Sequence, residues 1–198
     1  TEKGKQITNA IFGNAPRNKT ELGEGVYKNY GKGSNGFNVS SIQFAIHYMF
    51  ETDTSLNNFL RNVSETTQKN GYFIGTCFDG EKIFNYLKNT EFNQSKEIFE
   101  DGKKLWSITK RYDRNEFLAN ESSVGYGVDI YMESINKVFR EYLVNFEYLN
   151  RIMENYGFKI LSEEEAKSIG FPSGQGSFKD LYEIMKNEIK NKPKFKNK

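Results

Sequence analysis

The sequence has very few of the side chains that usually build catalytic or metal centres. It contains one histidine, His47, and one cysteine, Cys77, among 198 residues. A single cysteine excludes an internal disulfide and fits a reducing compartment. No run approaches the roughly 20 apolar residues that a membrane-spanning helix needs. We therefore expect no disulfide, no membrane contact and no metal site.

The charge of the chain is nearly balanced, with 28 Lys and Arg against 26 Asp and Glu, so the formal net charge is +2. A charge of this size is too small to attract nucleic acid by itself. The hydrophobic share of 36% and the aromatic share of 15% are typical of a folded globular chain. We interpret the Lys-rich run over residues 186–198 as a solvated terminus rather than a grip on RNA.

The middle of the chain predicts a β-α-β-α order, which is typical of a parallel sheet with crossover helices. Apolar, β-branched stretches predict buried strands, whereas apolar residues at helical spacing after a capping cluster predict helices. The predicted elements are a strand over 37–44, a helix that starts at 52–54 and contains 56–63, a strand over 72–77 and a short helix over 79–87.

The later part of the chain predicts further strands and helices. Alternating residues around Asp101 and Gly102 predict a hairpin, and an amphipathic segment closed by Gly157 predicts a helix. The predicted elements are the hairpin over 96–112, a strand over 126–132, a helix over 143–156, a strand over 158–161 and a helix over 177–191.

Residues 1–36 are polar and rich in Gly and Asn, and they lack a sustained period. We predict a long loop or insertion there, with residues 37–198 forming the C-terminal part of one domain. The segment 31–36 (GKGSNG) matches a dinucleotide-binding pattern. That pattern must follow a strand and open a helix, whereas here it leads into a strand, so these glycines are interpreted as turn residues.

The most informative segment is residues 43–48 (QFAIHY), at the end of the first predicted strand. An amide, two aromatic rings and an imidazole at a strand tip can hold a flat polar ligand. The alternative is that Phe44 and Tyr48 are core residues and that His47 is a structural, hydrogen-bonded histidine.

Three blocks in a fixed order carry a family resemblance: 37–51 (FNVSSIQFAIHYMFE), 60–65 (LRNVSE) and 70–76 (NGYFIGT). They resemble the central segment of eukaryotic and viral mRNA cap guanine-N7 methyltransferases. Two later blocks, 141–146 (EYLVNF) and 156–160 (YGFKI), are similar to further blocks of the same family. The resemblance covers about residues 35–165.

The insertion before Phe37 and the amino-acid sequence of the 141–146 block look most like the branch found in large DNA viruses. In that branch the domain is often one part of a multifunctional capping enzyme. The resemblance implies methyl transfer from S-adenosylmethionine to N7 of the 5′ cap guanosine of capped RNA. It also implies a cytoplasmic or virion location for a viral protein, and a nuclear one for a cellular protein.

By this resemblance, His47, Tyr48 and Glu141 match the residues that contact the cap guanine. Guanine presents one acceptor, O6, beside the donors N1–H and the exocyclic amine, so a selective pocket needs a donor and preferably a carboxylate. His47 and Glu141 supply that pair. The alternative for Glu141 is a first-turn helix carboxylate favoured by the helix dipole.

Gln43 resembles the family's cofactor-side amide, and we expect Phe44 and Tyr48 to bind the cofactor as well. An aromatic face favours a nearby cation and packs against purine rings, so Phe44 and Tyr48 suit a sulfonium cofactor and a purine. N7 carries a free lone pair and no proton, so the reaction needs positioning and no general base. We therefore expect no catalytic acid or base in the chain.

The sequence departs from the family in several places. The acidic Gly-rich loop, the ribose-binding acid and the preceding Lys that bind the cofactor have no counterpart, and Phe78 stands where Pro is common. A final strand with a cap-contacting aromatic residue is also missing. The resemblance then implies the second half of the sheet of a Rossmann-like class I α/β methyltransferase fold, without its N-terminal half.

Two interpretations of these departures remain open. The chain is either a fragment of a larger capping enzyme, or it works only with other capping-enzyme domains or a partner subunit that completes the sheet. In both cases we expect the chain alone to be incomplete and inactive. Two further functions are also possible: a non-catalytic stimulatory subunit of a heterodimeric capping methyltransferase, and a module that binds the cap or RNA.

Overall fold

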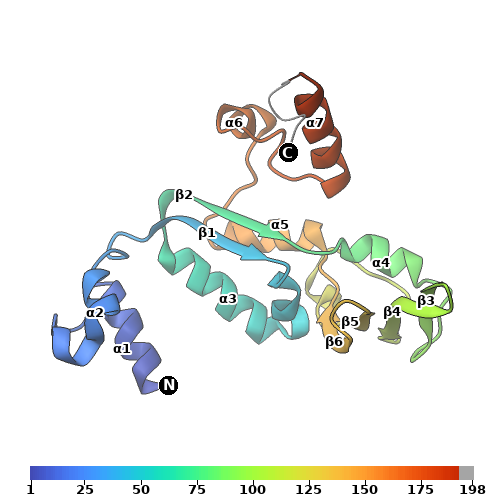
Figure 1. The fold of residues 1–198 in the computed structure, drawn as a ribbon, viewed down its shortest axis with the longest axis horizontal. Coiled ribbons are helices and arrows are strands. Elements are labelled where there is room, and N and C mark those ends of the chain that lie inside the picture. Colours follow the sequence, from blue (N-terminus) through green and yellow to red (C-terminus); the bar gives the residue numbers. More distant parts are fainter. Residues whose placement is uncertain (192–198) are drawn as a thin grey trace. The chain divides into compact units, whose positions relative to one another are not determined.

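The computed structural model describes residues 1–191, which belong to two compact units, Thr1–Phe158 and Lys159–Lys198 (Figure 1). No helix in this described part is both long and apolar enough to cross a bilayer. The first unit contains α1 (Glu2–Ile11), α2 (Lys19–Lys28), β1 (Phe37–Gln43), the 3₁₀ helix η1 (Ile46–Glu51), α3 (Asp53–Thr66), β2 (Thr67–Thr76), α4 (Gly80–Tyr86), β3 (Ser95–Glu100), β4 (Lys103–Arg111), the 3₁₀ helix η2 (Glu121–Ser123), β5 (Gly127–Met132), β6 (Lys137–Tyr142) and α5 (Phe146–Asn155). The second contains α6 (Glu163–Ser168) and α7 (Phe178–Asn191).

The first unit is organised around a β-α-β crossover. Strands β1 and β2 pair in parallel, and parallel neighbours require a long connection, which α3 provides. The hydroxyl of Thr52 caps α3 by accepting the backbone N–H of Ser55 at 3.1 Å. This confirms the predicted β-α-β order, but the prediction that both strands are buried was wrong, since no residue of β1 or β2 is buried. The helix ends at Thr66, and Asn70 lies inside β2 with a left-handed backbone conformation.

The main hydrophobic core lies between this crossover and α5. Leu56 and Leu60 of α3 are fully buried, and they belong to one cluster with Ile152 of α5. Ile42 of β1 and Phe73 of β2 pack against the same cluster. The helical spacing that predicted an amphipathic α3 therefore identifies its buried face correctly.

The second sheet is an antiparallel meander in the order β3-β4-β5-β6. The predicted hairpin is confirmed, with Asp101 and Gly102 at its tip, both with positive φ. The predicted strand over 126–132 is confirmed as β5. Strand β6 was not predicted. A second core of eight buried residues covers one face of this sheet: Phe84, Leu87, Ile108, Tyr112, Tyr126, Val128, Ile130 and Leu143.

The backbone at the start of helix α4 packs directly against the backbone of the segment before α5. A Cβ atom on Gly80 would lie 2.4 Å from the carbonyl oxygen of Val144, so this position requires glycine. The side chain of Asp79 caps α4 through the N–H of Lys82 at 3.1 Å. The helix predicted over 79–87 is thus confirmed, with Asp79 and Leu87 as its caps.

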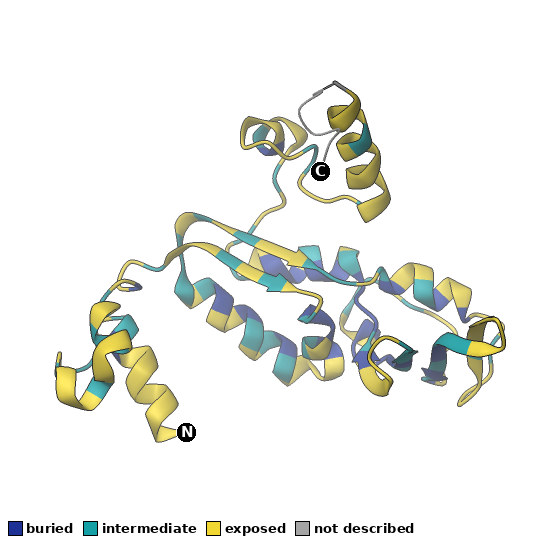
Figure 2. Ribbon diagram, in the orientation of Figure 1, coloured by how far each residue is buried: buried dark blue, intermediate teal, exposed yellow. Residues whose placement is uncertain are grey.

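Residues 1–36 differ from their prediction. They form helices α1 and α2, so the prediction of an irregular loop was wrong. Both helices are largely exposed, with Ala10 as their buried residue, which explains the absence of a clear apolar period (Figure 2). Gly31 and Gly36 have positive φ in the turns before β1, which confirms their interpretation as turn residues. The boundary between insertion and domain at residue 36 stays a proposal.

The chain after α5 also differs. Gly157 follows α5 with a φ of 84°, but residues 158–161 form no strand, so that prediction was wrong. In the second unit, Ser162 and Glu165 form a capping box at the start of α6. Helix α7 confirms the helix predicted over 177–191, and the end of the Lys-rich run lies outside the described residues.

Leu60 offers a test of the main core. Its side chain is fully buried, so Leu60→Ala should lower the free energy of unfolding by about 2–5 kcal/mol. Leu118, which is 49% exposed, is the matched control, and Leu118→Ala should change stability by about 0.5 kcal/mol or less. Urea unfolding followed by circular dichroism measures both. Equal effects of the two substitutions would contradict this core assignment.

Candidate functional site

The carboxyl ends of β1 and β2 meet at one edge of the parallel pair. Gln43 and Thr76, the last residues of the two strands, are direct register partners. Ligands of open α/β sheets bind outside the carboxyl ends of the strands. The segment that the sequence singled out, residues 43–48, begins at this edge.

The chain reverses at Phe44, directly after β1. Phe44 has a φ of 50°, a left-handed conformation that costs an aromatic residue about 1–2 kcal/mol. Its N–H donates to the carbonyl oxygen of Thr76 at 2.8 Å, which continues the β1–β2 ladder by one step. The turn leads through Ala45 into η1, whose first turn carries His47 and Tyr48.

His47 of η1 faces Glu141 of β6. Nε2 of His47 lies 3.6 Å from Oε2 of Glu141, and the two side chains are only 5% and 10% exposed. This separation is longer than a hydrogen bond. Within residues 1–191, neither ring nitrogen of His47 has a hydrogen-bond partner. Glu141 lies in β6, a strand that the sequence did not predict. The alternative that Glu141 is a carboxylate in the first turn of a helix is therefore wrong.

Burial shifts the pKa values of this pair in opposite directions. It lowers the pKa of His47 below 6.5 and raises the pKa of Glu141 above 4.5. Both groups are thus displaced toward their uncharged forms, because a charged group loses hydration when it is buried. An imidazole whose nitrogens have no hydrogen-bond partner among residues 1–191 and a carboxyl group thus face each other in one buried region.

Tyr48 completes this group. Its ring centroid lies 4.2 Å from that of His47 at an interplanar angle of 59°, and the residue is 41% exposed. Burial raises the pKa of Tyr48, and the nearby Glu141 raises it further. The structure therefore brings together all three residues that the resemblance assigned to guanine. The alternative of Tyr48 as a core residue is wrong, since its ring is partly open to solvent.

The residues assigned to the cofactor lie at the start of the same turn. Gln43 accepts a hydrogen bond from the hydroxyl of Thr76 at 2.8 Å, and its Nε2 donates to Ser41 at 3.0 Å. Phe44 is 52% exposed, so it is not a core residue, and its ring lies 6.3 Å from the ring of Phe78. An amide and an exposed aromatic face suit a polar, cationic cofactor with a purine ring.

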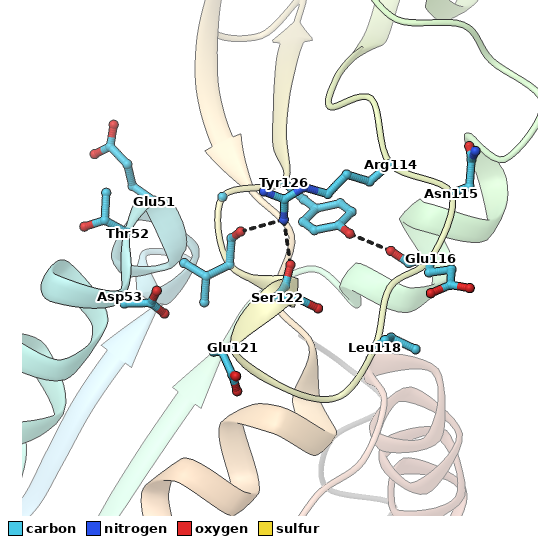
Figure 3. A pocket seen from close by; sticks show the side chains of 12 residues that line it. Glu51, Thr52, Asp53, Arg114, Asn115, Glu116, Leu118, Glu121, Ser122 and Tyr126 are labelled. Atoms are coloured by element: carbon cyan, nitrogen blue, oxygen red, sulfur yellow. Dashed lines mark hydrogen bonds between the residues drawn. The ribbon is translucent and has the colours of Figure 1, made fainter.

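A separate pocket of about 850 Å³ lies between the start of α3 and the loop before β5 (Figure 3). Arg114 spans it, donating to the carbonyl oxygen of Ser122 at 2.7 Å and lying 5.0 Å from the ring centroid of Tyr126. Four carboxylates contribute to the lining, so the pocket is poorly suited to an anionic RNA. The lining residues are Glu51, Thr52, Asp53, Arg114, Asn115, Glu116, Leu118, Glu121, Ser122, Val124, Gly125 and Tyr126. This set contains none of the five site residues predicted from the sequence.

Sequence reasoning missed two supporting residues. Thr76 bonds Gln43, and Glu51 of η1 accepts the hydroxyl of Tyr142 at 2.8 Å, which ties η1 to the end of β6. The first could have been found from the predicted strand ends, since parallel strands place their last residues side by side. The second depends on β6, which left no pattern. Within residues 1–191 no cluster of three or more His, Cys, Asp or Glu residues could hold a metal ion.

Comparison with known proteins gives this geometry a context. The family model described as the mRNA (guanine-N(7))-methyltransferase domain matches residues 5–196. A probable mRNA-capping enzyme of Acanthamoeba polyphaga mimivirus is 29% identical over 160 residues, which cover 75% of this chain and 13% of the relative.

Two yeast relatives are similar over a smaller share of the chain. The mRNA cap guanine-N(7) methyltransferase of Saccharomyces cerevisiae is 29% identical over 129 residues, covering 63% of this chain and 29% of that protein. The one of Debaryomyces hansenii is 30% identical over 121 residues, covering 61% and 23%. The chain thus spans less than a third of each of these three relatives. Because the family model covers nearly the whole sequence, the chain belongs to the mRNA (guanine-N(7))-methyltransferase domain family.

Proposed function

We propose that the protein containing this chain transfers a methyl group from S-adenosylmethionine to N7 of the 5′ cap guanosine of mRNA. The observation that carries the proposal is the buried pair of His47 and Glu141, whose imidazole nitrogens have no partner within residues 1–191. Buried polar groups are costly unless they are hydrogen-bonded, so this pair is suited to a polar ligand. The names of the relatives support the same activity.

Guanine fits the donor and acceptor of this pair. Its O6 accepts a hydrogen bond, and its neighbouring N1–H and amine donate, so O6 suits His47 and the two donors suit Glu141. A separation of 3.6 Å lets the imidazole and the carboxylate each reach its own atom on one guanine edge. Glu141 thereby distinguishes guanine from adenine, which has no N1–H to donate.

The work of these residues is positioning. N7 attacks with its own lone pair, so no residue has to remove a proton. His47 and Glu141 hold the base so that N7 points out of the pair, while the ring of Tyr48 packs against the purine. Methylation leaves a positive charge on the purine, and an aromatic face stabilises a nearby cation. Accurate placement of two reacting groups is the main contribution that such a site makes to the rate.

The cofactor side of the site is Gln43, Phe44 and Tyr48. The amide of Gln43 and the exposed ring of Phe44 lie at the carboxyl edge of β1 and β2, one turn before His47. These groups fit part of S-adenosylmethionine, since the amide can bond a polar group and the ring can pack on a flat or cationic one. The cofactor, when bound, supplies the methyl group on its sulfonium sulfur.

We further propose that β1 and β2 belong to the larger sheet of a Rossmann-like class I methyltransferase fold, as its second half. Parallel sheets are normally covered on both faces. One face of this pair packs on α3 and α5, but Val39 and Ile74 on the other are 49% and 42% exposed. Further strands and helices, from other domains of a capping enzyme or from a partner subunit, would cover them.

The alternatives make different predictions. A cap-binding module would bind a cap analogue but transfer no methyl group, and a stimulatory subunit would change the activity of another chain. The deciding experiment incubates the protein with capped RNA and labelled S-adenosylmethionine, then digests the RNA and identifies the methylated nucleoside. We expect N7-methylguanosine from the cap. Cap binding without methylation would overturn the proposal. The location of the protein remains a proposal: the cytoplasm or the virion for a viral protein, and the nucleus for a cellular one.

Glu141 tests guanine recognition. Glu141→Ala should lower kcat/KM for capped RNA, and the activation free energy derived from kcat/KM should rise by about 2–4 kcal/mol. The reason is that the substitution removes a charge-assisted hydrogen-bond acceptor from a buried site. Affinity for S-adenosylmethionine should hardly change. Glu133→Ala, which removes a carboxylate paired with Lys103 at the far end of the sheet, is the control and should leave both values intact. Equal losses for cap and cofactor would indicate a folding role instead.

Tyr48 separates ring packing from hydroxyl chemistry. If the ring face packs on the purine, Tyr48→Phe should keep most of the methylation rate, whereas Tyr48→Ala should lower it by roughly 10-fold or more. Single-turnover rates with capped RNA measure the difference. Similar losses in both variants would show that the hydroxyl group, near Glu141, is what the reaction needs.

His47 tests positioning against proton transfer. Burial lowers its pKa, so between the folded pKa and 6.5 the unfolded chain binds more protons than the native one. Its contribution to stability is therefore complete above pH 6.5 and is lost as the pH falls through the folded pKa. Because the chain has one histidine, the imidazole NMR signal should report a pKa below 6.5.

The methylation rate gives the second measurement for His47. Between neutral pH and pH 6.5 the rate should show no steep dependence on this group, and His47→Ala should lower the rate at every pH. A unit-slope ionisation near pH 6.5 that vanishes in His47→Ala would mean a proton transfer, and the positioning role would be wrong.

A further inference from the structure

Thr76 connects the two strand ends beneath the proposed cofactor side. Its Oγ1 is 3.2 Å from the backbone nitrogen of Phe44 and 2.8 Å from Oε1 of Gln43. The first contact accepts the Phe44 N–H, and the second donates the hydroxyl proton to the amide oxygen. One hydroxyl group at the end of β2 thus bonds the side chain of Gln43, the last residue of β1, and the main chain of Phe44, which follows it.

The Phe44 turn needs such support. Phe44 is a bulky residue at positive φ, and strained conformations of this kind persist only where their surroundings hold them. The helix that follows, η1, has no side-chain cap at its start. The N–H of Phe44 is shared between the carbonyl oxygen and the hydroxyl of Thr76, so both bonds that start the turn come from one residue.

The same hydroxyl orients the amide of Gln43. Because Oε1 accepts from Thr76 and Nε2 donates to Ser41 at 3.0 Å, both ends of the amide are held. The amide keeps one further N–H and one further lone pair for a ligand. Without the Thr76 bond, the exposed amide would rotate, and a ligand would have to order it on binding.

We propose that the hydroxyl group of Thr76 is a positioning element that fixes the Gln43 amide and the Phe44 ring for the cofactor. The inference rests on the proposed function, because it assigns these two groups to S-adenosylmethionine. Thr76 acts through its neighbours. It therefore affects how well the cofactor is bound, whereas the His47 and Glu141 pair governs the guanine base.

The test compares Thr76→Val with Thr76→Ser in the active protein. Valine keeps the shape of threonine but loses both hydroxyl bonds, whereas serine keeps them. Thr76→Val should weaken S-adenosylmethionine binding roughly 10-fold, about the effect of one or two hydrogen bonds. It should raise KM for the cofactor with little change in KM for capped RNA. Thr76→Ser should restore most of the affinity.

Thr67→Val is the matched control. Thr67 lies at the other end of β2, and its hydroxyl bonds Ser40 of β1 at 2.5 Å, so the same substitution removes a similar cross-strand bond away from the site. It should leave both KM values unchanged. Isothermal titration with S-adenosylhomocysteine measures affinity, and thermal melting measures the stability of each variant.

The outcomes separate this inference from the proposed function. If the wild-type protein neither binds the cofactor nor methylates the cap, the proposed function is wrong. If the wild type is active and Thr76→Val binds the cofactor as Thr76→Ser does, the positioning role is wrong. Parallel losses of affinity and melting temperature in Thr76→Val and Thr67→Val would also overturn it, since they would mean a role in stability alone.

Discussion

The parallel pairing of β1 with β2 is the constraint on which the site depends. Parallel register places Gln43 beside Thr76, so two chain segments end at one edge. A chain that leaves such an edge must cross over, and here the crossover begins with the Phe44 turn and η1. The turn therefore follows from the topology, and it carries His47 and Tyr48 away from the sheet toward β6.

Two local costs occur within this short segment. Phe44 is held at positive φ, and His47 buries both ring nitrogens without a hydrogen-bond partner among residues 1–191. A folded chain can afford a few such costs because the cores around α3, α5 and the second sheet are well packed. Strain and unsatisfied polar groups that coincide at one strand edge are typical of a binding site. A ligand that bonds the pair would recover part of that free energy.

The elements with strong apolar patterns could be predicted from the sequence. Helix α3 was predicted because its buried residues recur at helical spacing. Strand β1 was predicted from its apolar, β-branched sequence, although none of its seven residues is buried in the structure. Strand β6 was missed because four of its six residues are exposed, so no alternation shows. Helices α1 and α2 were missed for a similar reason, since their faces are polar and Gly23 interrupts α2. A periodic apolar pattern arises where one face of an element is buried, and α1, α2 and β6 are scarcely buried.

The site itself was only partly visible in the sequence. His47 and Tyr48 are neighbours in the chain, so their proximity could be inferred, but the approach of Glu141 depends on β6 and on its contact with η1. Only the resemblance linked these positions before the structure did. The supporting bonds of Thr76 and Glu51 leave no pattern of their own, because a hydroxyl or carboxylate at a strand or helix end is common everywhere.

The proposed methyl transfer to N7 explains why the proposed cofactor residues share one short segment with two of the three proposed guanine residues, His47 and Tyr48. The reaction requires the donor carbon, the sulfur and N7 in line, and misplacement by even one ångström costs much of the rate. If the cofactor and guanine residues lay on separate mobile elements, their independent motions would add. Here Gln43 and Phe44 connect to His47 and Tyr48 through a single turn held by Thr76. One short connection between the two groups of residues keeps the relative placement of the proposed donor and acceptor sites more constant than separate elements would.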